Sequence, residues 1–284
     1  MNRIDLVVVI DVKHANPNGN PDADNLPRTD PETEQGIITS VCLKRKIRNF
    51  IMEAKENMEG LDIYYKSGVV LNELNQEAYD AAGIKPEGTR MPKDAEKARE
   101  VTKFMTDRYW DVRTFGGVLS TGINCGAIKG PVQVSDAISK ERVSIIEHSI
   151  TRDSVTNEED REKERTFGRK NVVTHGVYVA TISFCPNLAR KTGFSEEDYE
   201  LLVEALKNLF RYDASSARPA GSMNVRKIIE FRHSSELGDA PAHKLHEAVV
   251  VESKVEEPHD FSDYDFSIDK SGLNDKVEVK ELVE

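Results

Sequence analysis

The sequence lacks the features that define several large protein classes. Its three cysteines are widely spaced and form no CxxC pair, so neither a disulfide framework nor a thiolate zinc site is predicted. No apolar run approaches the roughly 18 residues of a membrane span. The short apolar run at residues 6–10 is followed by Asp11 and Lys13, which is unlike a signal peptide. These absences predict a cytoplasmic protein that does not enter a membrane.

Motifs for catalysis and for cofactor binding are also missing. The sequence contains neither GxSxG nor HExxH, and the glycine-rich residues 115–130 match no nucleotide-binding loop. His243 and His246 are three residues apart without an evident third ligand, so an ordinary surface pair is favoured over a metal site. Asp22 and Asp24 lack the closing glutamate of a calcium loop. We therefore expect no cofactor, no metal and no catalytic residue.

The net charge of −11 argues against a nucleic-acid partner, but the charge is unevenly distributed. Residues 252–284 hold 11 acidic and 4 basic residues, which leaves the other residues with a net charge of only −4. We therefore expect residues 253–284 to form an acidic C-terminal tail. The body can carry a polyanion-binding face if its basic residues cluster.

Apolar patterns place helices and strands along the chain. Strands are expected over residues 4–12, 127–135, 142–150, 172–184, 225–231 and 248–251, and helices over residues 39–58, 94–110 and 195–210. Thr39 or Ser40 can cap the first helix, and Ser195 with Asp198 resembles a capping box. The order strand–loop–helix, long insertion, strand–helix–strand predicts an α+β fold with a ferredoxin-like, split βαβ plan. RNA-recognition domains use this plan, as do many unrelated proteins.

Basic residues gather at four places that suit a phosphate backbone. The Asn- and Pro-rich loop at residues 16–31, which includes Arg28, leads into a helix with the basic run at residues 44–48. At about 100° per residue, Lys44, Arg45 and Arg48 share a stripe beside the apolar one. The alternative interpretation is a solvated basic stripe on an amphipathic helix.

The other three places are loops with weaker signals. Lys129 ends the glycine-rich tract, where the glycines equally suit tight packing. Phe167 stands next to the basic pair Arg169 and Lys170, so it can stack on a base while its neighbours hold phosphates. Arg218 lies in a small, polar segment that suits contact with a backbone or a neighbouring subunit. Each of these is equally readable as an ordinary surface loop.

Four motifs together resemble a known family. These are NPNGNPDADNLPRTDPETEQGIITSVCLKRKIRNFI (residues 16–51), GAIKGPVQVSDAIS (126–139), EHSITRDSV (147–155) and TFGRKNVVTHGVYV (166–179). They look like the backbone, CRISPR RNA-binding subunit of the type I-C CRISPR Cascade complex, in the RAMP superfamily. The resemblance runs over nearly the whole chain, up to about residue 252.

The resemblance implies a fold and a set of partners. It implies a single RAMP-type domain over residues 1–252, with an RRM-like palm, a finger insertion at residues 61–113 and a thumb at residues 151–171. Copies of such a subunit stack head to tail along one CRISPR RNA and present its spacer bases to target DNA in antiviral defence. The implied partners are CRISPR RNA, target DNA through the guide, further copies, the cap RAMP subunit and the large subunit.

The resemblance also implies the residues of the RNA site. The candidate RNA cradle is Asn18, Arg28, Lys44, Arg45, Lys46 and Arg48, and the secondary candidates are Lys129, Arg152, Phe167, Arg169, Lys170 and Arg218. In this interpretation the chain is a structural subunit and not an enzyme. The alternative is a metal-dependent endoribonuclease that uses Asp22, Asp24 or Asp30, as backbone subunits of type III complexes use an acidic palm residue.

Overall fold

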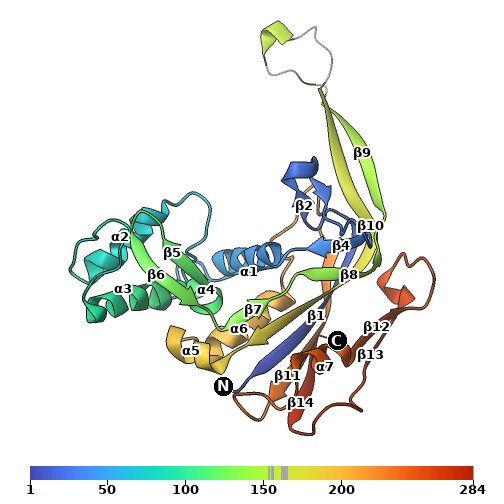
Figure 1. Ribbon diagram of the computed structural model, residues 1–284. Coiled ribbons are helices and arrows are strands. Elements are labelled where there is room, and N and C mark those ends of the chain that lie inside the picture. The colour runs from blue at the N-terminus through green and yellow to red at the C-terminus, as the bar shows by residue number, and fades with distance from the viewer. Residues whose placement is uncertain (153, 155–156, 161–165, 284) are drawn as a thin grey trace.

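The computed structural model has a mixed α+β fold built around one antiparallel sheet (Figure 1). It describes residues 1–152, 154, 157–160 and 166–283. The sheet order is β14 (Val277–Val283), β11 (Met223–His233), β1 (Ile4–Ala15), β10 (Thr166–Phe184), β8 (Ala137–Arg142) and β4 (Gln35–Ile38). Two further strands, β7 (Val132–Val134) and β9 (Ile145–Arg152), also pair with β10.

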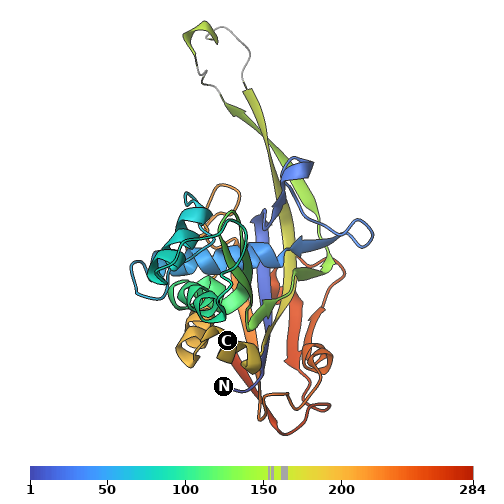
Figure 2. The ribbon, with the colours of Figure 1, turned by 60° about the vertical axis from the view of Figure 1, so that its left-hand side comes forward.

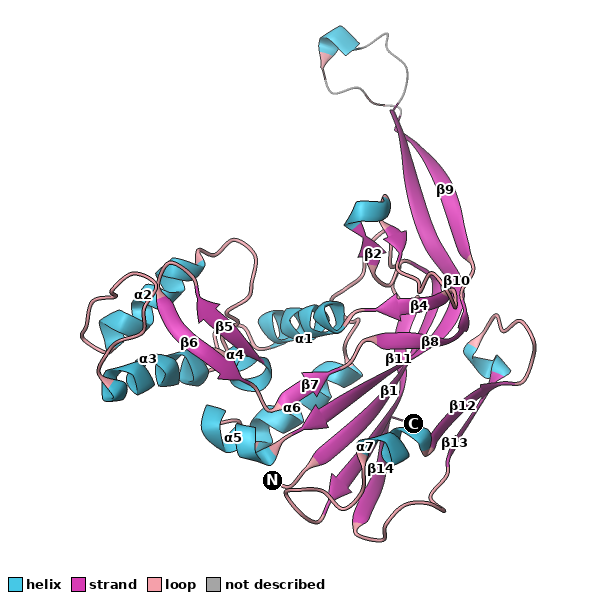
Figure 3. Ribbon diagram, viewed as in Figure 1, coloured by secondary structure: helices cyan, strands magenta, loops and turns pink. Residues whose placement is uncertain are grey.

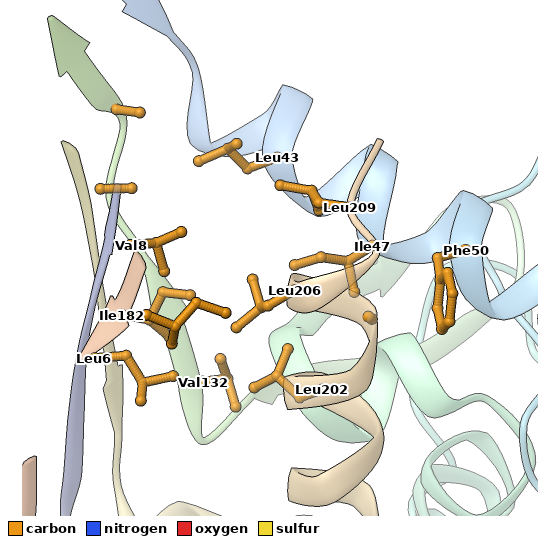
Figure 4. Close-up of a cluster of buried hydrophobic side chains, with 14 of the residues drawn as sticks. Leu6, Val8, Leu43, Ile47, Phe50, Val132, Ile182, Leu202, Leu206 and Leu209 are labelled. Atoms are coloured by element: carbon orange, nitrogen blue, oxygen red, sulfur yellow. The ribbon is translucent and has the colours of Figure 1, made fainter. Parts of the chain in front are cut away.

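The central strand β1 is buried on both faces, which explains the unbroken apolar run at its residues 6–10. Successive side chains of a strand point to opposite faces. Leu6 and Val8 therefore pack with helices α1 (Ser40–Ala54) and α6 (Glu196–Lys207), as Figure 4 shows. Val7 and Val9 pack on the other face, against α7 (Ala242–Glu247) and the hairpin of β12 (Val249–Ser253) and β13 (Tyr264–Ile268). Both faces of the sheet are thus covered.

The two sheet-covering helices begin where the sequence predicts. Thr39 caps α1, because its hydroxyl oxygen accepts a hydrogen bond from the backbone N–H of Cys42 at 3.2 Å. Ser195 and Asp198 form the predicted capping box of α6. These caps satisfy N–H groups that the helices themselves leave unpaired. Capping thereby fixes α1 on the sheet with its N-terminus beside the loop at residues 16–31.

Residues 61–129 form a separate lobe on the left of Figure 1. Its elements are α2 (Leu71–Ala81), α3 (Ala95–Arg108), α4 (Trp110–Phe115), β5 (Gly116–Ser120) and β6 (Asn124–Lys129). The lobe has its own core, which includes Tyr79, Val101 and Met105. Gly116 adopts a φ of +73°, and a Cβ there would lie 2.2 Å from the carbonyl oxygen of Ile128, so only glycine fits this crossing.

Strand β10 is longer than the sequence indicated, and its extension makes a hairpin that projects from the body (Figures 1 and 2). It pairs with β1 from Phe184 to Val173 and then with β9 from Val173 to Thr166. The charged excursion expected at residues 157–165 follows β9. Residues 157–159 are exposed, whereas residues 161–165 lie outside the described part of the chain.

The segment after Glu252 is not an appended tail, contrary to expectation. Strand β13 pairs with β12, and β14 pairs with β11 at the edge of the main sheet. Tyr264 and Val277 are buried. The signal was present as apolar and charged residues alternating over residues 277–283, but the high charge masked it. The acidic C-terminal segment therefore completes the sheet and covers its second face.

The remaining elements are short and lie at the margins. They are β2 (Gly19–Asn20), β3 (Leu26–Pro27), α5 (Pro186–Thr192) and the 3₁₀ turns Pro21–Ala23, Glu158–Asp160 and Phe261–Asp263. Strands β2 and β3 give the loop at residues 16–31 an ordered hairpin. None of the helices in the described part of the chain is long and apolar enough to cross a membrane.

Candidate nucleic-acid interface

Helix α1 lies between the lobe and the projecting hairpin (Figure 3). On one flank of α1, three charged side chains meet where the loop at residues 211–222 comes against the helix, and the charge of a fourth, Arg28, acts on the same thiol as theirs, that of Cys42. We call Arg28, Lys46, Asp213 and Arg218 the junction cluster. The carboxylate of Asp213 accepts from the ammonium group of Lys46 and lies 2.8 Å from Nε of Arg218. Two cations therefore share one carboxylate, and Arg28 adds a third positive charge that has no carboxylate partner in the described chain.

The charges of the junction cluster act on a half-buried thiol, that of Cys42. Burial raises the pKa of the Cys42 thiol, and all four charges of the cluster act on it, the three cations lowering this pKa and Asp213 raising it. The Nε atom of Arg28 and the Oδ1 atom of Asn16 are buried beside this junction without a hydrogen-bond partner in the described chain. Buried polar atoms are normally paired. The cluster thus has both surplus positive charge and unused hydrogen-bonding capacity.

Two loops are tied together around the cluster by backbone hydrogen bonds. The N–H of Asn16 donates to the carbonyl oxygen of Ala217 at 2.9 Å. The Oδ1 atom of Asn18 accepts from both the N–H (3.0 Å) and the hydroxyl (2.9 Å) of Thr39. Asn18 therefore fastens the loop to the start of α1. The contact of Asn18 with RNA stays a prediction, and its side-chain oxygen is already used in holding the loop to α1.

The prediction of an exposed basic stripe on α1 is wrong for Arg48, which is buried, and the cradle candidate Lys46 is buried as well. Nε of Arg48 lies 2.7 Å from Oδ2 of Asp111, and that carboxylate also accepts from the N–H groups of Tyr64 and Tyr65. The lobe covers Arg48, and the loop at residues 211–222 covers Lys46. The helical periodicity gave the angle of each residue around α1 but not what packs against it.

Lys44 and Arg45 form a second basic group, on the lobe side of α1. The Lys44 ammonium lies 5.4 Å from the ring centre of Phe115, and Nη1 of Arg45 donates to the carbonyl oxygen of Tyr65 at 2.6 Å. Neither cation has a carboxylate partner within the described residues. Burial, followed by the nearby Arg48 guanidinium, lowers the pKa of both side chains. An anion bound here would relieve this repulsion.

The projecting hairpin carries the third group. Phe167 is 72% exposed and lies opposite Thr151 in the register of β9 and β10. Arg169 lies on the same face of the hairpin, where its guanidinium is 3.6 Å from the carboxylate of Glu147. Lys170 lies on the opposite face, because side chains alternate along a strand. The side chain of Arg152 lies outside the described part of the structure.

Other predicted residues lie elsewhere. Lys129 is exposed on β6 and lines a groove of about 890 Å³ between α3 and α5. Asp22 and Asp24 are exposed in the loop at residues 16–31. Backbone N–H groups of Thr33 and Glu32 donate to Asp30, which lowers the pKa of that carboxyl. Within the described residues, no three His, Cys, Asp or Glu side chains are grouped to hold a metal ion.

Sequence reasoning missed Asp213 and Asp111. Asp213 is an acid within an otherwise cationic loop, between Arg211 and Arg218, and that contrast is the only signal it gave. Asp111 lies 63 positions from Arg48 in the sequence and gave no signal. Because both sheet faces are covered, a long ligand cannot stack on the sheet itself. Most of the predicted basic residues in the described part of the chain lie on α1, on its two flanks and on the hairpin.

Comparisons with known proteins agree with one another. The family model described as CRISPR-associated protein Cas7 matches residues 2–269. A CRISPR-associated protein Cas7 of Haloferax volcanii is 32% identical over an alignment of 231 residues. The alignment covers 73% of this chain and 65% of that relative, which is just under two thirds of the relative's length.

Solved structures give a likeness of fold. A chain of a CRISPR RNA-guided surveillance complex, pre-nicking, matches with a TM-score of 0.52 and 15% identity, covering 84% of this chain and 80% of that chain. A chain of a second CRISPR RNA-guided surveillance complex matches with a TM-score of 0.48 and 13% identity, covering 84% and 71%. At these identities the first match shows a shared fold alone, and the second adds no argument.

Proposed function

This chain belongs to the Cas7 family of CRISPR-associated proteins, and from that premise we propose that it is a non-catalytic backbone subunit that binds CRISPR RNA. It holds the RNA by its phosphates and presents the spacer bases for pairing with target DNA. The observation that carries this proposal is the surplus of cations along both flanks of α1, where Arg28, Lys44 and Arg45 have no carboxylate partner in the described chain.

The chemistry of these cationic groups suits binding to RNA phosphates without a preference for base sequence. Lys and Arg contacts to phosphates fix the position of a nucleic acid but carry no base information. In an RNA-guided complex, base pairing supplies the specificity instead. A subunit that reads no bases can therefore bind any spacer, and repeated copies can bind one guide along its length.

We propose an RRM-like, ferredoxin-like palm for the body of the chain. The order β11–β1–β10–β7/β8, with α1 and α6 packed on one face, supports this plan. We assign the lobe at residues 61–129, which includes the proposed insertion at 61–113, as the finger. We assign the hairpin of β9 and β10, which includes residues 151–171, as the thumb.

The proposed assembly is a head-to-tail row of copies on one CRISPR RNA in the prokaryotic cytoplasm. An interface between unlike surfaces that does not close yields an open helix. We propose the cap RAMP subunit and the large subunit of Cascade as the other partners. The four motifs at residues 16–51, 126–139, 147–155 and 166–179 support assignment to type I-C.

Co-expression with a CRISPR array tests the proposal directly. We expect the protein to purify with RNA of uniform length, as an oligomer whose mass exceeds the 31.9 kDa chain several-fold. The absorbance ratio at 260 and 280 nm, RNA gel analysis and light scattering measure this. A monomer free of RNA, which also ignores an added spacer-length transcript at low salt, would refute the proposal.

Phe167→Ala is expected to weaken RNA binding without lowering stability. The ring is 72% exposed, so its removal leaves no cavity. Stacking of a base on an aromatic ring contributes about 1–3 kcal/mol, which is roughly 5- to 150-fold in affinity. Fluorescence anisotropy with a labelled spacer-length RNA measures the loss, and Phe167→Trp serves as the control that keeps a stacking surface. Equal affinity of the alanine variant and the native protein would contradict the stacking role.

A further inference from the structure

We propose, on the basis of the proposed RNA-binding function, that Asp213 is a positioning residue of the junction cluster. It orients Arg218 so that Arg218 binds one phosphodiester group of the RNA, and the unpaired charge of Arg28 adds to the positive charge of this flank. Asp213 itself repels that phosphate, so its role is to orient a neighbour and not to touch the ligand. The family resemblance implied Arg28 and Arg218 as RNA-binding residues, but it did not imply a role for Asp213.

The first argument is that the Arg218 side chain has two defined partners. Its Nε lies 2.8 Å from Oδ2 of Asp213 in an ion pair that lacks the geometry of a hydrogen bond, and its Nη1 donates to the carbonyl oxygen of Asn16 at 3.4 Å. Its backbone forms a tight turn with Ser215 through two hydrogen bonds of 2.8 and 3.1 Å. A guanidinium has five N–H donors. Within the described chain its Nη2 has no protein partner, and the side chain keeps 29% of its exposure.

The second argument is the charge of the cluster. Lys46, whose side chain is only 4% exposed, shares the Asp213 carboxylate with Arg218. Arg28 has no carboxylate partner in the described chain, and its Nε is buried without an acceptor. Burial of unpaired charge is unfavourable. A phosphodiester supplies one negative charge and two free oxygen atoms, and guanidinium groups bind such oxygens in a fork.

The third argument is that the site joins elements that are far apart in sequence. Arg28 comes from the loop before α1, Lys46 from α1, and Asp213 with Arg218 from the loop before β11. Only Asp213 bonds to both α1 and its own loop through its carboxylate. If it is lost, Arg218 keeps only its weak contact to the Asn16 carbonyl oxygen. The loop then loses the ion pairs that hold Arg218 beside Lys46 of α1.

The Asp213→Asn variant distinguishes a positioning role of Asp213 from an effect of its negative charge on RNA affinity. If Asp213 only reduced the positive charge, its neutralisation would tighten RNA binding. We expect the opposite, a loss of about tenfold, and a decrease of about 0.7 in the magnitude of the slope of log affinity against log salt, because one phosphate contact is lost. Asp213→Glu is expected to restore part of the affinity. The probe is a fluorescein-labelled, spacer-length RNA of arbitrary sequence.

Glu200→Gln is the matched control, since Glu200 is exposed on α6 and has no ion pair in the described chain. It removes the same charge and is expected to leave the affinity unchanged or slightly raised. Arg218→Gln keeps the Asp213–Lys46 pair, and we expect it to lose as much affinity as Asp213→Asn. The double variant should bind no more weakly than either single variant, because both remove one contact.

Three outcomes would overturn the inference. The first is that Asp213→Asn binds RNA as tightly as Glu200→Gln, and the second is that the losses of Asp213→Asn and Arg218→Gln simply add in the double variant. If thermal unfolding shows that Asp213→Asn does not fold, Arg218→Gln decides, and native affinity in that variant refutes the phosphate contact. Failure of the native protein to bind RNA at any salt concentration would instead refute the proposed function, on which this inference rests.

Discussion

Asp111→Ala is expected to lower the free energy of unfolding by about 3–5 kcal/mol, the loss typical of a broken buried ion pair. Asp111 is fully buried, and its carboxylate binds the Arg48 guanidinium and the N–H groups of Tyr64 and Tyr65. Its removal leaves one charge and two N–H groups without partners inside the protein. Chemical denaturation followed by circular dichroism measures the loss.

Two further variants make this measurement specific. Asp107→Ala removes an exposed carboxylate in the same lobe, whose pair with Lys103 lies in solvent, so we expect a much smaller loss. Adding Arg48→Met to Asp111→Ala removes the unpaired charge and should recover part of the stability. Equal losses for Asp111→Ala and Asp107→Ala would contradict the role of Asp111 as the joint between α1 and the lobe.

Lys44→Ala combined with Arg45→Ala is expected to weaken RNA binding by about a hundredfold at low salt, at roughly tenfold for each charged contact. The slope of log affinity against log salt should fall in magnitude by about 1.4, which is 0.7 for each lost phosphate contact. Neither side chain has a carboxylate partner in the described chain, so the change strands no buried charge. Anisotropy titrations at several salt concentrations measure both quantities.

The matched control is Lys85→Ala with Lys93→Ala, which removes two exposed lysines of the lobe. The net charge changes equally, so a general charge effect would give the same loss of affinity in both double variants. We expect the control to keep its salt dependence. An unchanged slope in a folded Lys44 and Arg45 double variant would show that the RNA follows a different surface.

Local rules predicted the central elements well. Strand β1 and helix α6 carry strong apolar patterns, and the Ser195–Asp198 capping box forms as its spacing indicated. These features depend on residues close in sequence, whose geometry is fixed by the repeat of a helix or a strand.

Long-range neighbours could not be read from the sequence. The burial of Lys46 depends on Asp213, which is 167 positions away, and no local pattern links the two. The same holds for Arg48 and Asp111. The strand at residues 277–283 was missed for another reason, since its outward charges concealed an alternating pattern. The sequence therefore placed the basic residues on α1 correctly, but it did not show that Lys46 and Arg48 are buried.

The 19-residue strand β10 has a mechanical consequence. It leaves the centre of the sheet and enters the projecting hairpin as one hydrogen-bonded ribbon, without a loop between the two parts. Because no loop separates the two parts, the projecting hairpin is expected to bend together with the central sheet rather than to rotate about a hinge.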